Sequence, residues 1–166
     1  MKCTYCELVE GKRPARKVYE DSTLLAILVP KPAALGHILI VPKAHKQIIT
    51  QLDDNLVARL WSVSQKLTGV LFDLLAPGGT NIIIQNGAAA GQTIAHFGVH
   101  IIPRTEGDGL GWVWQPKAIT EEVLDQLHGL LKVPVSEEKR PEKVKELMEL
   151  KKVEPEELLK QLKRIP

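Results

Sequence analysis

Residues 95–102 limit the possible folds of this chain more than any other segment, because histidine or glycine alternates there with large apolar side chains. In a β-strand, successive side chains point to opposite faces. One face would carry His96, Gly98 and His100, with about 6.6 Å between successive positions. The opposite face would carry apolar side chains, those of Phe97, Val99 and Ile101. We therefore predict a strand that is buried on one face, open to polar chemistry on the other, and ended by Pro103.

The segments around this strand predict a mixed architecture. Short apolar runs bounded by turn residues indicate four more strands, at residues 17–19, 24–29, 37–41 and 81–85. Leucine and valine recur at helical spacing between residues 56 and 74, with an N-cap at 53–55 and the stop Pro77-Gly78-Gly79 after them. Small residues at 86–91 predict a loop. Strands, one long helix and then two more strands are typical of an α+β domain with an antiparallel sheet.

Length and charge exclude several classes of protein. The chain has 166 residues, the size of one ordinary domain. Its net charge of +2 gives no electrostatic basis for nucleic-acid binding. The N-terminal residues MKCTYCELVEGK lack the apolar stretch of a signal peptide, and no long apolar run follows. We therefore expect a cytoplasmic protein with neither a nucleic-acid nor a membrane partner.

Charged residues concentrate at the C-terminal end of the chain. Residues 136–166 hold eight acidic and nine basic side chains. We expect a globular domain over residues 1–135 and a charged helical extension over residues 136–166. A helix beginning at Pro155 would place Leu158, Leu162 and Ile165 on one face. That stripe either binds a partner or packs against the chain's own domain, which is the commoner use of such a face.

Residues 91–104, GQTIAHFGVHIIPR, resemble the signature of the histidine triad (HIT) family of nucleotide-binding hydrolases and transferases. The signature alternates three histidines with apolar residues, and this chain departs from it at Gly98. Residues 17–21 and 36–45 are similar to two N-terminal blocks of the same family. The resemblance covers about residues 3–115. It implies a twisted antiparallel sheet with one long helix, assembled as a homodimer.

The resemblance also assigns catalytic roles. In the family, the middle histidine attacks the α-phosphorus of a nucleotide, and water then cleaves the nucleotidyl-imidazole intermediate. Gly98 stands at that position without a nucleophilic atom, so the chain is expected to be a largely inactive form that traps substrate. His96 matches the first triad histidine, and His100 matches the third, which contacts the phosphate and assists the leaving group. Gly98 is either a deliberate replacement, which the intact surroundings favour, or the mark of a naturally silent nucleotide binder.

Two further segments match nucleotide-binding positions of the family. Gly91, Gln92 and Thr93 correspond to the loop that holds the phosphates, with a plain hairpin connection as the alternative. Gln85 and Asn86 correspond to the amide position close to ribose and phosphate.

The expected nucleoside contacts depart from the family pattern. Family members usually carry Asp or Asn where this chain has Val29, and a valine accepts no hydrogen bond from ribose. Ile27 and Val29, together with Tyr5 and Leu8, either wall an apolar pocket for the base or belong to the core.

Cys3 and Cys6 form a C-x₂-C pair that suits a zinc ion or a redox couple. The N-terminal position disfavours the redox couple, which usually lies between a strand and a helix. Bacterial-type HIT proteins have the same pair, and the resemblance implies a closed structural zinc site of Cys3, Cys6, His45 and His96. Unpaired buried thiols are the alternative. His37 would at most lie next to these ligands.

The sequence thus predicts a HIT-type hydrolase of nucleotide phosphoramidates or other nucleotidyl-linked compounds, with a purine nucleotide such as AMP as ligand. A diadenosine polyphosphate hydrolase is one alternative, favoured by the spacing from Gln85 to His96. A binding protein without turnover is another. A nucleotidylyltransferase is disfavoured, because that branch has glutamine where this chain has His100.

Overall fold

The computed structural model describes residues 3–111 and 114–132. The chain divides after Gly111 into two units, of which the first holds the sheet and the long helix. The second unit contains α3 (Glu121–Leu131), an amphipathic helix with Val123 buried. The predicted boundary at residue 135 and the predicted tail helix fall outside the described residues and stay predictions. Within the described ranges, no helix combines the length and the apolar character that crossing a membrane requires.

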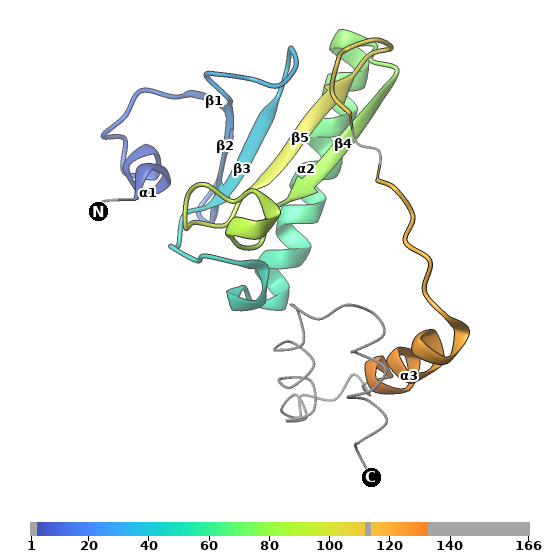
Figure 1. Ribbon diagram of the computed structural model, residues 1–166. Coiled ribbons are helices and arrows are strands. Elements are labelled where there is room, and N and C mark those ends of the chain that lie inside the picture. The colour runs from blue at the N-terminus through green and yellow to red at the C-terminus, as the bar shows by residue number, and fades with distance from the viewer. Residues whose placement is uncertain (1–2, 112–113, 133–166) are drawn as a thin grey trace. The chain divides into compact units, whose positions relative to one another are not determined.

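Five antiparallel strands form the sheet in the order β1-β2-β3-β5-β4 (Figure 1). They are β1 (Arg16–Glu20), β2 (Leu24–Leu28), β3 (Ile38–Pro42), β4 (Gly79–Ile84) and β5 (Val99–Arg104). β5 pairs with both β3 and β4, so it lies inside the sheet, and the register places His100 opposite Leu39. This architecture confirms the predicted α+β class and the antiparallel pairing.

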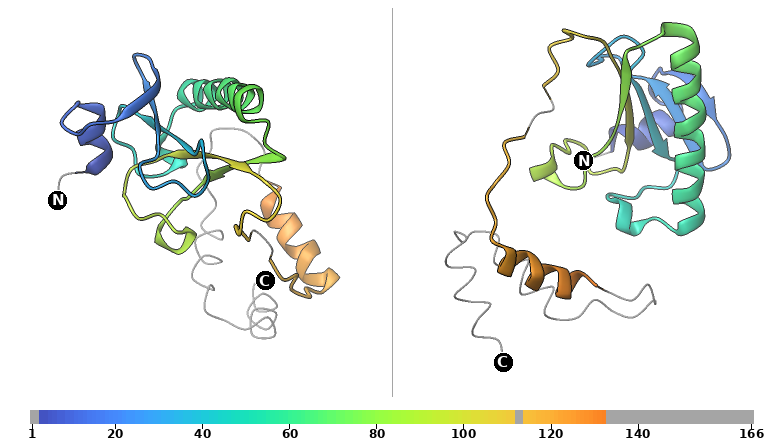
Figure 2. Two further views of the ribbon diagram at one scale, coloured as in Figure 1. Left: turned by 90° about the horizontal axis from the view of Figure 1, so that it is seen from above. Right: turned by 90° about the vertical axis from the view of Figure 1, so that its right-hand side faces the viewer.

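The helix α2 (Asp54–Leu75) covers one face of the sheet (Figure 2). The Asp53 carboxylate accepts a hydrogen bond from the Leu56 backbone N–H at 2.9 Å, which caps the first turn. Ala76 adopts a left-handed conformation, with φ of 43°, and ends the helix just before Pro77. The predicted cap and stop are both confirmed. The core on this face joins α2 to three strands through Leu24, Ala26, Ile38, Ile40, Leu60, Val63, Leu67, Leu71, Phe97, Val99 and Ile101.

The opposite face of the sheet carries a second, smaller apolar cluster. Its buried members alternate along β2 and β3 with those of the first core, as the pleat of a strand requires: Leu25, Ile27, Leu39 and Val41. The helix α1 (Thr4–Val9), which the sequence analysis did not predict, packs Tyr5, Leu8 and Val9 against this cluster. Two short 3₁₀ segments, η1 (Ile49–Gln51) and η2 (Ala88–Ala90), complete the first unit.

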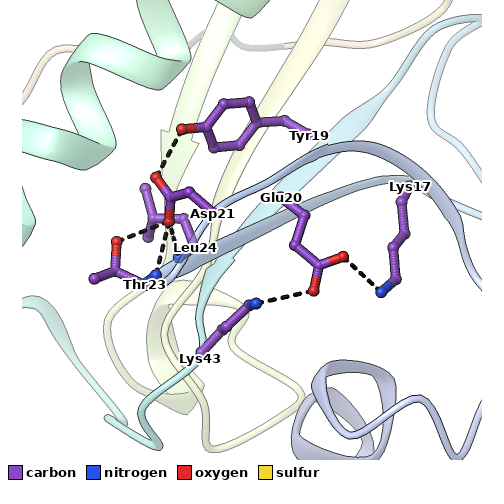
Figure 3. A network of polar contacts seen from close by, with 7 residues as sticks. All are labelled: Lys17, Tyr19, Glu20, Asp21, Thr23, Leu24 and Lys43. Carbon is purple, nitrogen blue, oxygen red and sulfur yellow. Dashed lines mark hydrogen bonds and ion pairs between the residues drawn. The ribbon is translucent and has the colours of Figure 1, made fainter.

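A network of polar contacts closes the turn between β1 and β2 (Figure 3). The Asp21 carboxylate accepts hydrogen bonds from the Tyr19 hydroxyl at 2.6 Å and from the backbone N–H groups of Thr23 and Leu24, both at 2.7 Å. Arg59 of α2 donates to the same carboxylate at 2.9 Å. These contacts join the N-terminal hairpin to the long helix. The sequence analysis found the turn but not the network.

Candidate functional site

A small pocket beside β5 brings together most of the predicted phosphate-binding residues. Its lining consists of Tyr5, Gln85, Gln92, Thr93, Ile94, His96, Gly98 and His100. It holds about 70 Å³. A site for a whole small-molecule ligand usually holds about 300–1,000 Å³, so this pocket fits a group of phosphate size. The three triad positions thus face one hollow, and the apolar residues between them lie in the core.

The predicted strand over residues 95–102 is wrong at both ends, since β5 spans Val99–Arg104. The residues before it make backbone hydrogen bonds outside the sheet, one to a distant part of the chain and one local. The Phe97 backbone N–H donates to the Lys46 carbonyl at 2.6 Å, and the His96 N–H donates to the Ile94 carbonyl at 2.7 Å. Because the Phe97 bond holds the segment beside the chain that follows β3, the segment joins the ladder only at Val99.

The end of the motif has a structural role. Pro103 pairs with Thr80 inside the ladder instead of ending the strand. Arg104 donates to the Asp108 carboxylate at 2.6 and 2.8 Å and to Asn81 Oδ1 at 2.5 Å. The hydrogen bond from Arg104 holds the pKa of the Asp108 carboxyl well below its ordinary value. Arg104 therefore fixes the loop that follows β5.

Gly98 serves no evident need of the backbone, because it is not among the glycines with positive φ. A Cβ atom at this position would lie 2.8 Å from Leu39 Cδ1 and 3.6 Å from the Ile40 carbonyl oxygen. The close contact is with the end of a flexible side chain. A larger residue therefore fits at position 98 once the Leu39 side chain has rotated.

His37 lies beside His100 and orients it, which the sequence analysis did not predict. The Ala33 backbone N–H donates to His37 Nδ1 at 3.1 Å, so the proton of the neutral His37 ring is on Nε2. That Nε2 lies 3.0 Å from His100 Nδ1 and donates to it. The proton of neutral His100 is then on its own Nε2, where it serves a ligand as a hydrogen-bond donor.

Both rings of this pair are neutral near pH 7. Burial, with a smaller effect of His100, lowers the pKa of His37 to about 4. Burial also lowers the pKa of His100. The prediction that His37 lies at most next to the metal ligands is wrong, because its ring is hydrogen-bonded to His100.

The conformation of the loop before β5 requires a glycine at position 91. Gly91 has a φ of 86°, and a Cβ there would lie 2.6 Å from Gln85 Nε2. The Gln92 side chain accepts a hydrogen bond from the Gly87 N–H at 2.8 Å and donates to the Gln47 carbonyl at 2.8 Å. Gln92 therefore braces the loop from within, in addition to lining the pocket.

Four of the predicted nucleotide-binding residues do not line the pocket, and one of them is Gly91, which shapes the loop instead. Asn86 Oδ1 accepts a hydrogen bond from the Ile49 N–H at 3.0 Å. Ile27 is buried in the second apolar cluster, and Val29 packs against it. Tyr5 contacts that cluster and also lines the pocket. Tyr5 is therefore the residue that connects this cluster with the pocket.

The predicted metal ligands come together in the structure. Cys3 Sγ, Cys6 Sγ, His45 Nδ1 and His96 Nδ1 all lie within 4.8 Å of one another. Cys6 Sγ is 3.2 Å from His45 Nδ1, and Cys3 Sγ is 3.4 Å from His96 Nδ1. Two thiols and two imidazoles are a typical donor set for a structural metal site. These side chains therefore fit a bound metal ion.

The second nitrogen of His96 supports this assignment. Nε2 donates a hydrogen bond to the Pro42 carbonyl at 2.9 Å, which leaves the lone pair of Nδ1 free for a metal. Burial lowers the pKa of His96, in part offset by that hydrogen bond, so the ring is neutral as a ligand must be. With Nε2 bonded to Pro42 and Nδ1 in the candidate metal-ligand group, His96 has a positioning role beside the pocket.

Comparison with known proteins identifies the fold family. Residues 10–107 match the family model described as the HIT domain.

The chain belongs to the HIT family.

Three relatives illustrate the match. The crystal structure of a HIT family member from Bacillus subtilis is 33% identical and covers 82% of this chain and 100% of its own, with a TM-score of 0.76. A zinc-bound histidine triad protein from Mycobacterium smegmatis is 36% identical, covers 70% of this chain and 85% of its own, and has a TM-score of 0.63. Adenosine 5′-monophosphoramidase HNT1 of Candida albicans is 32% identical over 135 residues, which are 78% of this chain and 89% of the relative.

Membership of the HIT family confirms the resemblance found in the sequence. Of the residues that line the pocket of this HIT domain, the sequence analysis missed only Ile94. It also missed the link from Ala33 through His37 to His100. The position of His37 directly before a buried strand that pairs with β5 was the available signal.

Proposed function

We propose that this HIT-family protein binds a purine nucleotide such as AMP, or a nucleotidyl conjugate, with a phosphate in the pocket beside β5. By its site it belongs with hydrolases of nucleotide phosphoramidates and related nucleotidyl-linked compounds. The observation that carries the proposal is the orientation of His100 by His37 toward the pocket that Gly98 also lines. The relative from Candida albicans, named as a monophosphoramidase, supports the substrate class.

The same geometry explains why the chain itself would be largely inactive. His100 Nε2–H would donate to a phosphate oxygen or to the leaving group. Position 98, where the family has its nucleophilic imidazole, offers no atom that can form a bond to phosphorus. What remains is binding and electrostatic stabilisation of the phosphate, which alone supply part of the rate of a complete site.

We propose zinc as the ion held by Cys3, Cys6, His45 and His96. The donor set and the zinc-bound relative from Mycobacterium smegmatis support this choice. Four protein ligands leave no position for water, so the ion would supply a structural cross-link.

We also propose that the protein is a homodimer. β4 lies at the edge of the sheet, where Ile82 is 38% exposed. α2 exposes Trp61, Val70 and Phe72. An open strand edge and exposed large apolar side chains suit pairing with a second copy. Sedimentation velocity of the full chain tests this, and a monomer at all concentrations contradicts it.

Restoring the nucleophile tests the proposed activity. We expect the zinc-loaded chain to bind AMP and to turn over neither adenosine 5′-phosphoramidate nor diadenosine polyphosphates. In Gly98→His we expect an adenylyl adduct, detected by intact-protein mass, and a rate at least about 10³-fold higher. Preference for the phosphoramidate supports the first substrate class, and preference for the dinucleotide supports the alternative.

Gly98→Ala is the matched control, because its Cβ displaces Leu39 without adding an imidazole. If the unaltered chain binds AMP but the Gly98→His variant stays at the background rate, the protein is a nucleotide-binding protein without turnover. Absence of AMP binding to the zinc-loaded native chain would contradict the proposed function altogether.

A further inference from the structure

The helix α1 connects the metal-ligand cluster to the nucleotide pocket. Cys3 caps this helix and Cys6 lies within it, so two of the four candidate ligands belong to this N-terminal segment. His45 and His96 belong to the body of the domain. Tyr5 lies between the two cysteines and lines the pocket together with Gly98 and His100. A metal ion bound by all four ligands would therefore join the segment that carries Tyr5 to the body.

Few other contacts hold α1 in place. The helix has six residues, none of them fully buried. In the described part of the chain, the backbone hydrogen bonds of residues 3–12 outside regular structure all stay within that segment. A helix this short is marginal without tertiary contacts. Its attachment includes the cysteine–histidine cluster and the packing of Tyr5, Leu8 and Val9 against the second apolar cluster.

The position of Tyr5 depends directly on a candidate metal ligand. Its ring meets the His96 ring edge to face, with 5.7 Å between centroids and 69° between planes. His96 is fixed on its other side by the Pro42 carbonyl. The ring of Tyr5 therefore packs against a side chain that the ion would bind and that also lines the pocket.

We propose that the metal ion controls nucleotide affinity by holding α1, and with it the Tyr5 ring, in the wall of the pocket. This inference rests on the proposed function and deepens it, because it makes the ion a determinant of ligand binding as well as of stability. Two ligands that favour the same arrangement of a protein bind cooperatively, and the effect is reciprocal. AMP should then strengthen zinc binding by the same factor by which zinc strengthens AMP binding.

The proposal is tested by titrating the full chain with AMP in a calorimeter, once in the presence of zinc and once in the presence of a strong chelator. We expect AMP affinity to fall about tenfold without the metal. In zinc-loaded Tyr5→Ala, AMP affinity should already be weakened, and chelation should change it less than about threefold. Zinc affinity without AMP, measured by competition with a chromophoric chelator, shows how far the lost packing of Tyr5 weakens the metal site itself, so the AMP titrations are made at saturating zinc. Tyr5→Phe should restore the metal dependence, because it restores the ring.

Thr4→Ala is the matched control on the same helix, since Thr4 does not line the pocket. It should retain the full dependence of AMP affinity on zinc. Equal AMP affinity of the native chain with and without zinc, or an unreduced metal dependence in Tyr5→Ala, would overturn the inference while leaving the proposed function intact. Failure of the zinc-loaded native chain to bind AMP would instead overturn the proposed function.

Hydrogen exchange provides a second measurement if the metal-free chain unfolds. In the zinc-loaded native protein, AMP should slow amide exchange of residues 4–9, because the bound ligand would contact Tyr5. In zinc-loaded Tyr5→Ala, AMP should leave that exchange unchanged. Slowing of equal size in both proteins would contradict a role for the ring.

Discussion

Two polar clusters of the first unit differ in where their hydrogen bonds go. In the turn between β1 and β2, the Asp21 carboxylate is bonded to a phenol, a hydroxyl and two backbone amides (Figure 3). Arg59 of α2 also donates to it. Beside β5, His37 Nε2 donates a hydrogen bond to Nδ1 of His100, whose ring lines the pocket. The first cluster completes itself and holds the hairpin to α2. The second orients a ring that lines a pocket, as the proposed binding function requires.

The two clusters also differ in the charge state that they favour for their titratable groups. Burial opposes ionisation of Asp21, but the hydrogen bonds that it accepts outweigh burial and hold the pKa of the carboxyl well below its ordinary value. At His37, burial is not offset, and the pKa of the ring falls to about 4. The turn thus stabilises a charge, whereas the pocket keeps its histidines neutral.

Removing the metal should produce the largest change in stability, because the ion would join side chains from distant parts of the chain. Zinc at about a thousand times its Kd would stabilise the fold by about 4 kcal/mol. For a chain of this size, that corresponds to a fall in Tm of about 10 °C in strong chelator. Scanning calorimetry measures it, with Cys6→Ser as the control in which chelator has little further effect. An unchanged Tm would rule out a structural ion.

The substitution Asp21→Ala should cause the next largest loss of stability and should leave AMP binding unchanged. Losing the hydrogen bonds of this carboxylate should cost about 2–3 kcal/mol of unfolding free energy, measured by urea denaturation. AMP affinity of the folded protein should stay within about twofold. Asp73→Ala, at an exposed position of α2, is the control and should change stability by less than about 0.5 kcal/mol. A loss of AMP affinity in Asp21→Ala would break the separation between the two clusters.

The smallest expected effect is a pH dependence that belongs to His37. The pKa of histidine is about 6.5 in an unfolded chain, against about 4 in the fold. Below pH 6.5, the unfolded chain binds a proton that the folded ring does not accept, so stability falls as the pH falls. This group should contribute a loss of about 2 kcal/mol between pH 7 and pH 5.

His37→Asn should lose correspondingly less stability over the same interval, with both proteins in strong chelator so that acid release of metal does not contribute. Urea denaturation at pH 7 and pH 5 measures the difference. Parallel pH profiles for the two proteins would show that His37 does not supply the effect.

The sequence was sufficient for features that depend on local patterns. The alternation at residues 96–101 predicted which side chains enter the core and which face the pocket, although β5 begins only at Val99. The cap at Asp53 and the stop at Pro77 predicted the long helix. The spacing of the cysteines, with the family resemblance, predicted the metal-ligand group.

Features that depend on distant contacts could not be predicted in this way. The helix α1 has six residues and forms against the sheet, so its own sequence gives little signal. The start of β5 depends on the bond between Phe97 and Lys46. The pairing of His37 with His100 joins residues 63 positions apart, and only the register of β3 with β5 brings them together.

The Leu39 methyl group beside Gly98 has a consequence for chemical complementation. Cδ1 of Leu39 lies only 2.8 Å from where a Cβ would be, but free imidazole added to replace the absent side chain carries no Cβ. Leu39 therefore restricts a side chain attached at position 98 more directly than it restricts a small nucleophile that enters the pocket from solution.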